Sequence, residues 1–175
     1  MRIHVFVSHI FSSPAHHYFT REKFDIGSAA TYELSSVELE PGRGIKEDRF
    51  EFSKYSITLI SQEVMKMVCE ELELPYEPSL FRRNIVISGV NLNQLIGKEF
   101  SIDGIGFRGL EHCAPCTWMN AVMKKGAYKL MSGRGGLRVE VIKEGVLKTG
   151  PNTLIAEGID KLLDPLEAQR KPKIP

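Results

Sequence analysis

The stretch GLRVEVIKEGVLKTG (Gly136–Gly150) decides the fold class, because apolar and polar residues alternate along it. Its first run alternates Leu, Val and Val with polar residues, and a Lys-Glu-Gly turn then leads to a second apolar run. Alternation of this kind places one face of a strand against a core. The stretch therefore predicts a β-hairpin.

Similar short runs recur along the chain and are separated by turn residues. They are Ile3–Ser8, Ser35–Glu40, Tyr55–Ile60, Phe81–Ser88 and two runs that flank Asp103-Gly104. The strands follow one another instead of alternating with helices. This order favours a mainly β, mostly antiparallel barrel or sandwich over a doubly wound sheet.

Two or three helices complete the expected elements. SQEVMKMVCEEL (61–72) has the apolar spacing of a helix, with Ser61 as its cap and Cys69 as a small buried hydrophobe. CTWMNAVMKK (116–125) is a shorter candidate, and the tail from Pro151 has some helical spacing. A long loop is expected over 12–33.

Composition excludes several classes of protein. The 175 residues suit one domain, and a net charge of +1 gives no nucleic-acid signal. Three cysteines do not make a secreted disulfide framework. No run reaches the roughly 18 apolar residues of a membrane helix, and the first residues are not typical of a leader. We therefore expect a cytoplasmic protein with no nucleic-acid or membrane partner.

The pair in CAPC, Cys113 and Cys116, leaves four interpretations open. A zinc site needs about four ligands, and only the adjacent His112 accompanies the pair. A thioredoxin-like dithiol is expected in a βαβ context, which the surrounding strands do not provide. Cys116 alone, placed before a helix, could act as a thiolate that binds a soft metal or carries sulfur. Both cysteines could also simply pack in the core.

Basic residues gather in three places along the chain. They are Arg82-Arg83-Asn84, Arg43 and Arg49 with Asp48 between them, and Arg134 and Arg138 around Gly135-Gly136. Arginine binds phosphate and planar polar rings through a rigid fork of donors. The glycine-rich loop lacks the P-loop pattern. Taken together with a soft thiolate, these groups would suit an anionic, sulfur-rich cofactor. His16 and His17 are either exposed loop residues or proton donors at a site.

An ordered set of segments resembles the MOSC domain, which is named for the C-terminal domain of molybdenum-cofactor sulfurases. The set is GRGIKEDRF, ITLIS, FRRNIVISGVNLNQLIGKEFSIDGIGF, CAPC and GRGGLRVEVIKEGVLKTG. The similarity spans 36–150 and is greatest to small stand-alone bacterial members. It implies a single MOSC-like domain over 1–175 with an antiparallel β-barrel fold.

The resemblance also implies roles for particular residues. Cys116 matches the shared cysteine that binds molybdenum or carries sulfur as a persulfide. FRRN is similar to the FRPN of amidoxime-reducing proteins, in which Arg and Asn help to hold the cofactor. Arg82 and Asn84 occupy those positions, and Gly44, Asp48 and Arg49 match a turn of the family. In this interpretation Cys113 tunes or protects Cys116, Arg134 helps to anchor the pterin phosphate, and His16 or His112 relays protons.

Some features depart from the family pattern. Glu47 replaces the glycine that usually precedes the aspartate of the turn. Gly150-Pro151 stands where the family often ends its last hairpin with Gly-Asp. The pyridoxal-phosphate domain of the full sulfurases is missing, so pyridoxal phosphate is not expected.

Two functional hypotheses follow. The leading one is a molybdenum-cofactor protein, an oxidoreductase that reduces a small N-oxygenated substrate with electrons from a redox partner. The alternative is a sulfur-carrier or cofactor-delivery module that uses a Cys116 persulfide. The sequence identifies neither the substrate nor the electron donor.

Overall fold

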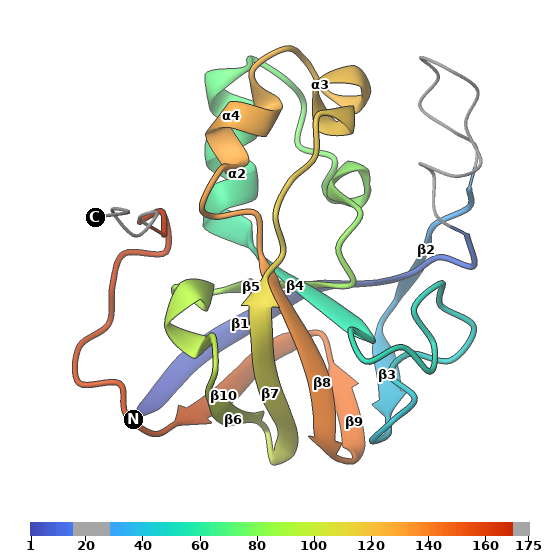
Figure 1. Ribbon diagram of the computed structural model, residues 1–175, viewed down its shortest axis with the longest axis vertical. Helices are drawn as coiled ribbons and strands as arrows, with labels where there is room; N and C mark the ends of the chain where they lie inside the picture. Colours follow the sequence, from blue (N-terminus) through green and yellow to red (C-terminus); the bar gives the residue numbers. More distant parts are fainter. Residues whose placement is uncertain (16–28, 170–175) are drawn as a thin grey trace, which may run out of the picture.

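The computed structural model describes residues 1–15 and 29–169, and the described elements are mostly strands (Figure 1). The strands are β1 Arg2–Ser12, β2 Tyr32–Leu34, β3 Ser36–Leu39, β4 Ile57–Ser61, β5 Ile85–Ser88, β6 Glu99–Ile102, β7 Ile105–His112, β8 Leu137–Lys143, β9 Gly145–Lys148 and β10 Gly150–Ala156. The helices are α2 Gln62–Glu71, α3 Trp118–Val122 and α4 Ala127–Met131, with 3-10 turns η1 Pro78–Phe81 and η2 Leu92–Leu95.

Seven of the strands close into a barrel. Their order is β10-β6-β7-β8-β4-β5-β1, and β1 pairs again with β10, for example Ile3 opposite Leu154. These pairs are antiparallel except β4 with β5, which is parallel. Strand β1 is long enough to pair with β10 along its first half and with β5 and β2 along its second half. The predicted mainly β, barrel-like fold is therefore confirmed.

Alternation along β1 shows how the sequence fills this barrel. Ile3, Val5 and Val7 are buried, whereas Arg2 and His4 are exposed. The buried side chains join those of the other strands in one apolar cluster. Burial of such side chains contributes roughly 1.5–3 kcal/mol each to folding.

The predicted hairpin over Gly136–Gly150 is wrong in its pairing, although both of its strands exist. Strand β8 pairs with β7 and β4, whereas β9 pairs with β3. Gly145 is the first residue of β9, and an added Cβ there would lie 2.7 Å from the Ile105 side chain. The alternation therefore identified the strands correctly, but the local turn did not determine their partners.

The tail also differs from the prediction, because residues after Gly150 form β10 rather than a helix. Leu154 and Ala156 are buried and Ile155 is exposed, which is the period of a strand. The predicted strand Phe81–Ser88 likewise begins only at Ile85, after the 3-10 turn η1 and a left-handed residue at Arg82.

Helices α2, α3 and α4 cover one end of the barrel (Figure 1). Ser61 caps α2 by accepting a hydrogen bond from the Val64 amide at 3.3 Å, as predicted. Cys69 is 3% exposed, which confirms it as a core residue, and its burial raises the pKa of the thiol. This cap has its own apolar cluster, separate from the barrel interior.

The expected helix over 116–125 is shorter than predicted and is followed by a second one. Helix α3 ends at Val122, and Gly126 has a φ of 111°, which a side chain rarely tolerates. The Asn120 side chain then accepts hydrogen bonds from the Gly126 and Tyr128 amides and starts α4.

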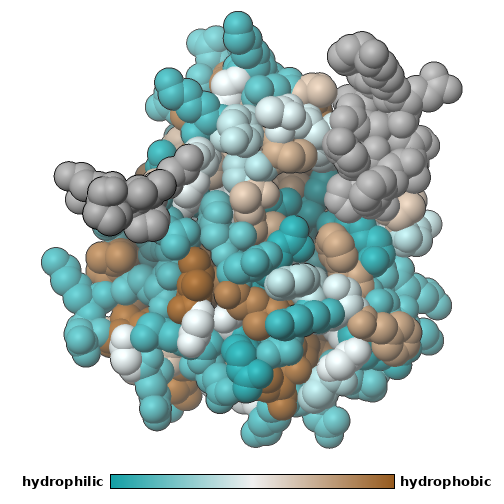
Figure 2. All heavy atoms as spheres, viewed as in Figure 1, coloured by the Kyte–Doolittle hydropathy of each residue, from teal (hydrophilic) through white to brown (hydrophobic). Residues whose placement is uncertain are grey.

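None of the helices in the described part of the chain is long and apolar enough to cross a membrane. The face of the barrel in Figure 2 carries its apolar side chains in small patches between polar ones. Patches of this size are ordinary on a protein surface and do not by themselves indicate a partner.

Candidate functional site

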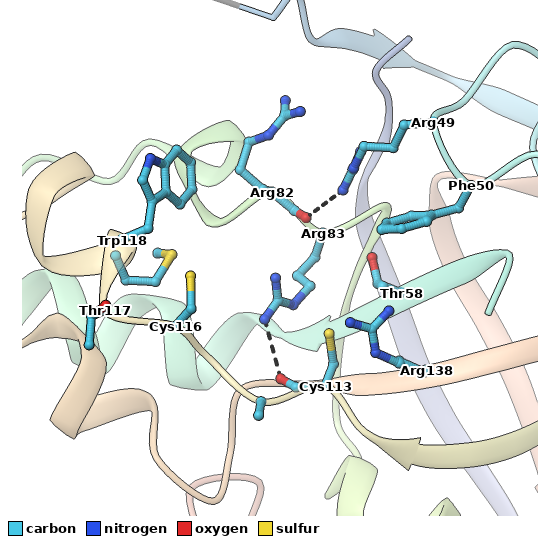
Figure 3. A pocket seen from close by; sticks show the side chains of 12 residues that line it. Arg49, Phe50, Thr58, Arg82, Arg83, Cys113, Cys116, Thr117, Trp118 and Arg138 are labelled. Atoms are coloured by element: carbon cyan, nitrogen blue, oxygen red, sulfur yellow. Dashed lines mark hydrogen bonds between the residues drawn. The ribbon is translucent and has the colours of Figure 1, made fainter. Parts of the chain in front are cut away.

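A cavity of about 390 Å³ is lined by residues of the barrel and of the helical cap (Figure 3). Its wall includes two thiols, four arginines and several apolar side chains. These residues are Cys113, Cys116, Arg49, Arg82, Arg83, Arg138, Phe50, Thr58, Ala114, Thr117, Trp118 and Met119. Among the described residues that line it there is no aspartate or glutamate, so the wall is cationic and suits an anion.

The two thiols lie in the loop between β7 and α3. Cys116 is exposed, whereas Cys113 is only 2% exposed, and both are free thiols. The Cys113 amide donates to the Gly136 carbonyl at 2.8 Å, which fixes the start of the loop against the chain that enters β8. Cys116 therefore offers an accessible sulfur from an anchored loop.

Arg49 is held deep in the wall by a buried carboxylate and by backbone. Its Nη2 donates to the Arg82 carbonyl at 2.9 Å, and its Nη1 lies 3.5 Å from Oδ1 of Asp48. Burial lowers the pKa of Arg49; the charge of Asp48 opposes this shift, and the charges of Arg83 and Arg138 add to it. Its Nε is buried and has no hydrogen-bond partner among the described residues. A buried donor of this kind is costly unless something accepts from it.

Asp48 lies behind the cavity wall, not in it. Its Oδ1 accepts from the Ser13 amide at 2.8 Å and its Oδ2 from the Phe50 amide at 3.1 Å. The carboxylate therefore fixes the turn that carries Arg49 and Phe50.

Arg82 lines the cavity, but most of its donors are already used. Its Nη2 donates to Oγ of Ser13 at 2.8 Å and to the Ala15 carbonyl at 2.9 Å, and its Nη1 donates to Oγ1 of Thr31. Burial, followed by the charge of Arg49, lowers the pKa of Arg82 to about 10. Arg82 thus ties together parts of the chain before and after the segment 16–28.

Arg83 turns the opposite way and supports the thiol loop. It donates to the Gly135 carbonyl from Nε at 3.0 Å and to the Cys113 carbonyl from Nη2 at 3.2 Å. Arg138, on β8, lies with its guanidinium carbon 5.8 Å from the centre of the Phe50 ring. The guanidinium carbon of Arg49 is 4.7 Å from the same ring, so Phe50 lies close to two cations.

Besides Asp48, three residues predicted for the site lie outside the lining. Asn84 is 1% exposed, and its side chain bonds Thr58 and the Phe11 carbonyl. His112 accepts a hydrogen bond from the Gly135 amide at 3.0 Å through Nε2. Arg134 donates to the Leu166 carbonyl at 2.7 Å and borders a different, small cavity. His16 lies outside the described residues.

Sequence reasoning did not include several lining residues among the site candidates. Arg83 and Arg138 stand out in the sequence only as basic residues, and no site role is predicted for Phe50, Thr58 or Trp118. The sequence does contain a signal for two of them: Phe50 directly follows Arg49, and Trp118 lies two residues after Cys116.

The donor set fits an anionic group that carries a thiophilic metal. The described residues contain no group of three His, Cys, Asp or Glu that could hold a metal ion by themselves. A metal at Cys116 would therefore need further ligands from its own cofactor. The accessible soft sulfur and the unsatisfied buried guanidinium donor are the features that such a cofactor would use.

Comparison with known proteins agrees with this fold. The family model described as MOSC domain matches residues 47–152. The crystal structure of the YuaD protein from Bacillus subtilis has a TM-score of 0.70 at 15% identity and covers 89% of this chain and 97% of its own. YiiM from Geobacillus stearothermophilus has a TM-score of 0.63 at 15% identity over 90% of this chain and 78% of its own. YiiM from Escherichia coli has a TM-score of 0.61 at 18% identity over 96% and 75%. A search of curated proteins gave no match.

Proposed function

The chain belongs to the MOSC domain family, and from this premise we propose that its cationic cavity binds the molybdenum cofactor with Cys116 as a ligand of the metal. The observation that carries the proposal is an exposed thiol in a cavity that is also lined by four arginines. A thiolate is a soft ligand for a transition metal, and guanidinium groups bind phosphate.

When bound, the cofactor would supply two-electron reduction of an N-oxygenated compound, with electrons from a separate redox protein. The chain's own residues would balance the charge of the cofactor and exclude water from the cavity. Arg83, Arg138 and the free Nε of Arg49 would balance the negative charge of the cofactor. Phe50, Trp118 and Met119 would exclude water from the cavity and give a small substrate an apolar contact surface.

Metal analysis of the wild-type protein and two cysteine variants tests this proposal. The proteins would be purified anaerobically from a host supplied with molybdate. We expect stoichiometric molybdenum in the wild type, its loss in Cys116→Ser, and its retention in Cys69→Ala, the matched control in the helical cap. Absence of molybdenum from all three would contradict stable cofactor binding. Molybdenum-loaded protein would then be tested for reduction of an N-hydroxylated amidine by an artificial electron donor.

A sulfur-carrier role for Cys116 is the second candidate. It is supported by the exposed thiol of Cys116, because a persulfide needs only one accessible cysteine. This function predicts a mass increase of one sulfur on Cys116 without bound metal. A cytoplasmic location is part of both proposals, since reducing conditions keep free thiols available.

A further inference from the structure

Cys113 and Cys116 differ in access although they line the same cavity. Cys116 is exposed. Cys113 lies three residues before it, at the anchored start of the loop, and is buried. Figure 3 shows both sulfur atoms on the same side of this loop. Cys69, the third cysteine, belongs to the helical cap and does not line the cavity. Oxidation-sensitive cysteines are solvent-accessible and often lie next to a resolving cysteine.

We propose that Cys113 is the resolving thiol of Cys116, and that oxidation joins the two cysteines in a reversible disulfide. A hydroperoxide first oxidises the Cys116 thiol to a sulfenic acid and is itself reduced to the alcohol or to water. The Cys113 sulfur then attacks the Cys116 sulfur. The S–O bond breaks, the S–S bond forms, and the hydroxyl group leaves with the Cys113 proton as water.

The way the loop is held supports these separate roles. Its Cys113 end is fixed by the Gly136 carbonyl at 2.8 Å and by Arg83 at 3.2 Å. Its Cys116 end leads into α3, a five-residue helix whose cap residue Thr117 makes no side-chain capping bond. The Cys116 carbonyl accepts a hydrogen bond from the Met119 amide at 3.0 Å, so closing the disulfide moves the first turn of α3 together with Cys116 and leaves the barrel strands in place.

The consequence for the metal rests on the proposed function, whereas the thiol chemistry does not. A disulfide removes the Cys116 sulfur as a ligand and at the same time protects it from irreversible oxidation. A dithiol reductant restores both thiols by exchange. During oxidative stress the disulfide would thus keep the Cys116 sulfur from binding metal until a reductant restores the thiol.

Peptide mass spectrometry of the full chain tests the proposal. Cys69→Ala protein, its Cys113→Ala derivative and its Cys116→Ser derivative would be treated with the same molar excess of hydrogen peroxide and then alkylated. The Cys69→Ala protein should lose two hydrogens across Cys113 and Cys116 and regain both thiols with dithiothreitol. The Cys113→Ala derivative should gain two or three oxygens on Cys116 and lose this recovery. In the Cys116→Ser derivative, Cys113 should remain a free thiol.

Equal recovery of Cys116 with and without Cys113 would overturn the proposal, as would a disulfide formed only between chains. If the Cys113→Ala derivative does not fold, the Cys69→Ala protein alone decides: sulfinic acid on Cys116 beside a free Cys113 is the contrary result. None of these readouts requires molybdenum. Failure of cofactor binding and failure of the thiol pair are therefore observed separately.

Discussion

Asn84 and Thr58 form hydrogen bonds with each other through both their backbone and their side-chain atoms. Oδ1 of Asn84 accepts from the Thr58 amide at 3.0 Å and from its hydroxyl at 2.8 Å, and the Asn84 amide donates to the same hydroxyl at 3.0 Å. Nδ2 of Asn84 also donates to the Phe11 carbonyl at 3.1 Å. One buried amide thus joins the entries of β4 and β5 to β1, beneath the cavity wall that Thr58 helps to form.

Asn84→Ala should therefore reduce stability strongly. It leaves the Thr58 amide and the Phe11 carbonyl without their buried partner, which we expect to cost about 2–4 kcal/mol of unfolding free energy. Urea denaturation measures this loss, and Asn93→Ala, on η2, is a control with a partly exposed amide. An Asn84→Ala protein of normal stability that has lost only its molybdenum would instead indicate direct contact with the cofactor.

Arg134→Gln and Arg138→Gln should have opposite effects, although both residues flank the same glycine pair. Arg134 donates a hydrogen bond to the Leu166 carbonyl, and this contact lies away from the thiols. Its loss should therefore cost about 1–2 kcal/mol of unfolding free energy and leave the molybdenum content unchanged. Arg138 lines the cavity, lies beside the Phe50 and Tyr55 rings, and forms a partly exposed 3.5 Å ion pair with Glu111, so its loss should lower molybdenum content with little change in stability. Metal analysis and urea denaturation of both variants check this, and a reversed pattern would contradict the assignment.

The strands could be predicted because their signal is local. Each buried face imposes a period of two on its own segment, as Ile3, Val5 and Val7 show. The partner of a strand is not a local property. Strand β9 follows β8 after a single residue and yet pairs with β3, which lies more than a hundred residues earlier.

The candidate site could be predicted only as a set of residue types. Arg82 and Arg83 are adjacent and chemically identical, but the left-handed backbone of Arg82, with a φ of 56°, directs them to different partners. Asn84 and Arg134 have the donors that a cofactor needs, but the fold uses these donors internally. Side-chain direction depends on tertiary contacts, which the residue types do not determine.

Mild acid should destabilise the protein through His112. Burial, followed by the charge of Arg83, lowers the pKa of this imidazole below its ordinary value of 6.5. The unfolded chain therefore binds the proton more readily, so the His112 contribution is fully present above pH 6.5 and is lost as pH falls through the folded pKa. Protonation also removes the acceptor of the Gly135 amide. Unfolding free energies measured from pH 7.5 downward should fall less steeply for His112→Gln than for the wild type, and parallel curves would contradict the role of His112.

Gly135→Ala should displace the thiol loop while the barrel remains intact. An added Cβ would lie 2.6 Å from the Cys113 carbonyl oxygen and 2.8 Å from Cδ of Pro115, so the loop must move and the Arg83 bond to that carbonyl must lengthen. Overpacking of this kind costs about 1–3 kcal/mol. The reaction of Cys113 with a thiol reagent should accelerate, because its shielding depends on the same contact.

Gly42→Ala is the matched control for this substitution. A Cβ at Gly42 meets nothing within 4 Å, and its cost comes from a φ of 76°, which we expect to be about 1 kcal/mol. Gly42→Ala should therefore lower stability without changing the reactivity of Cys113. Equal reactivity of Cys113 in both variants would show that Gly135 does not control access to this thiol.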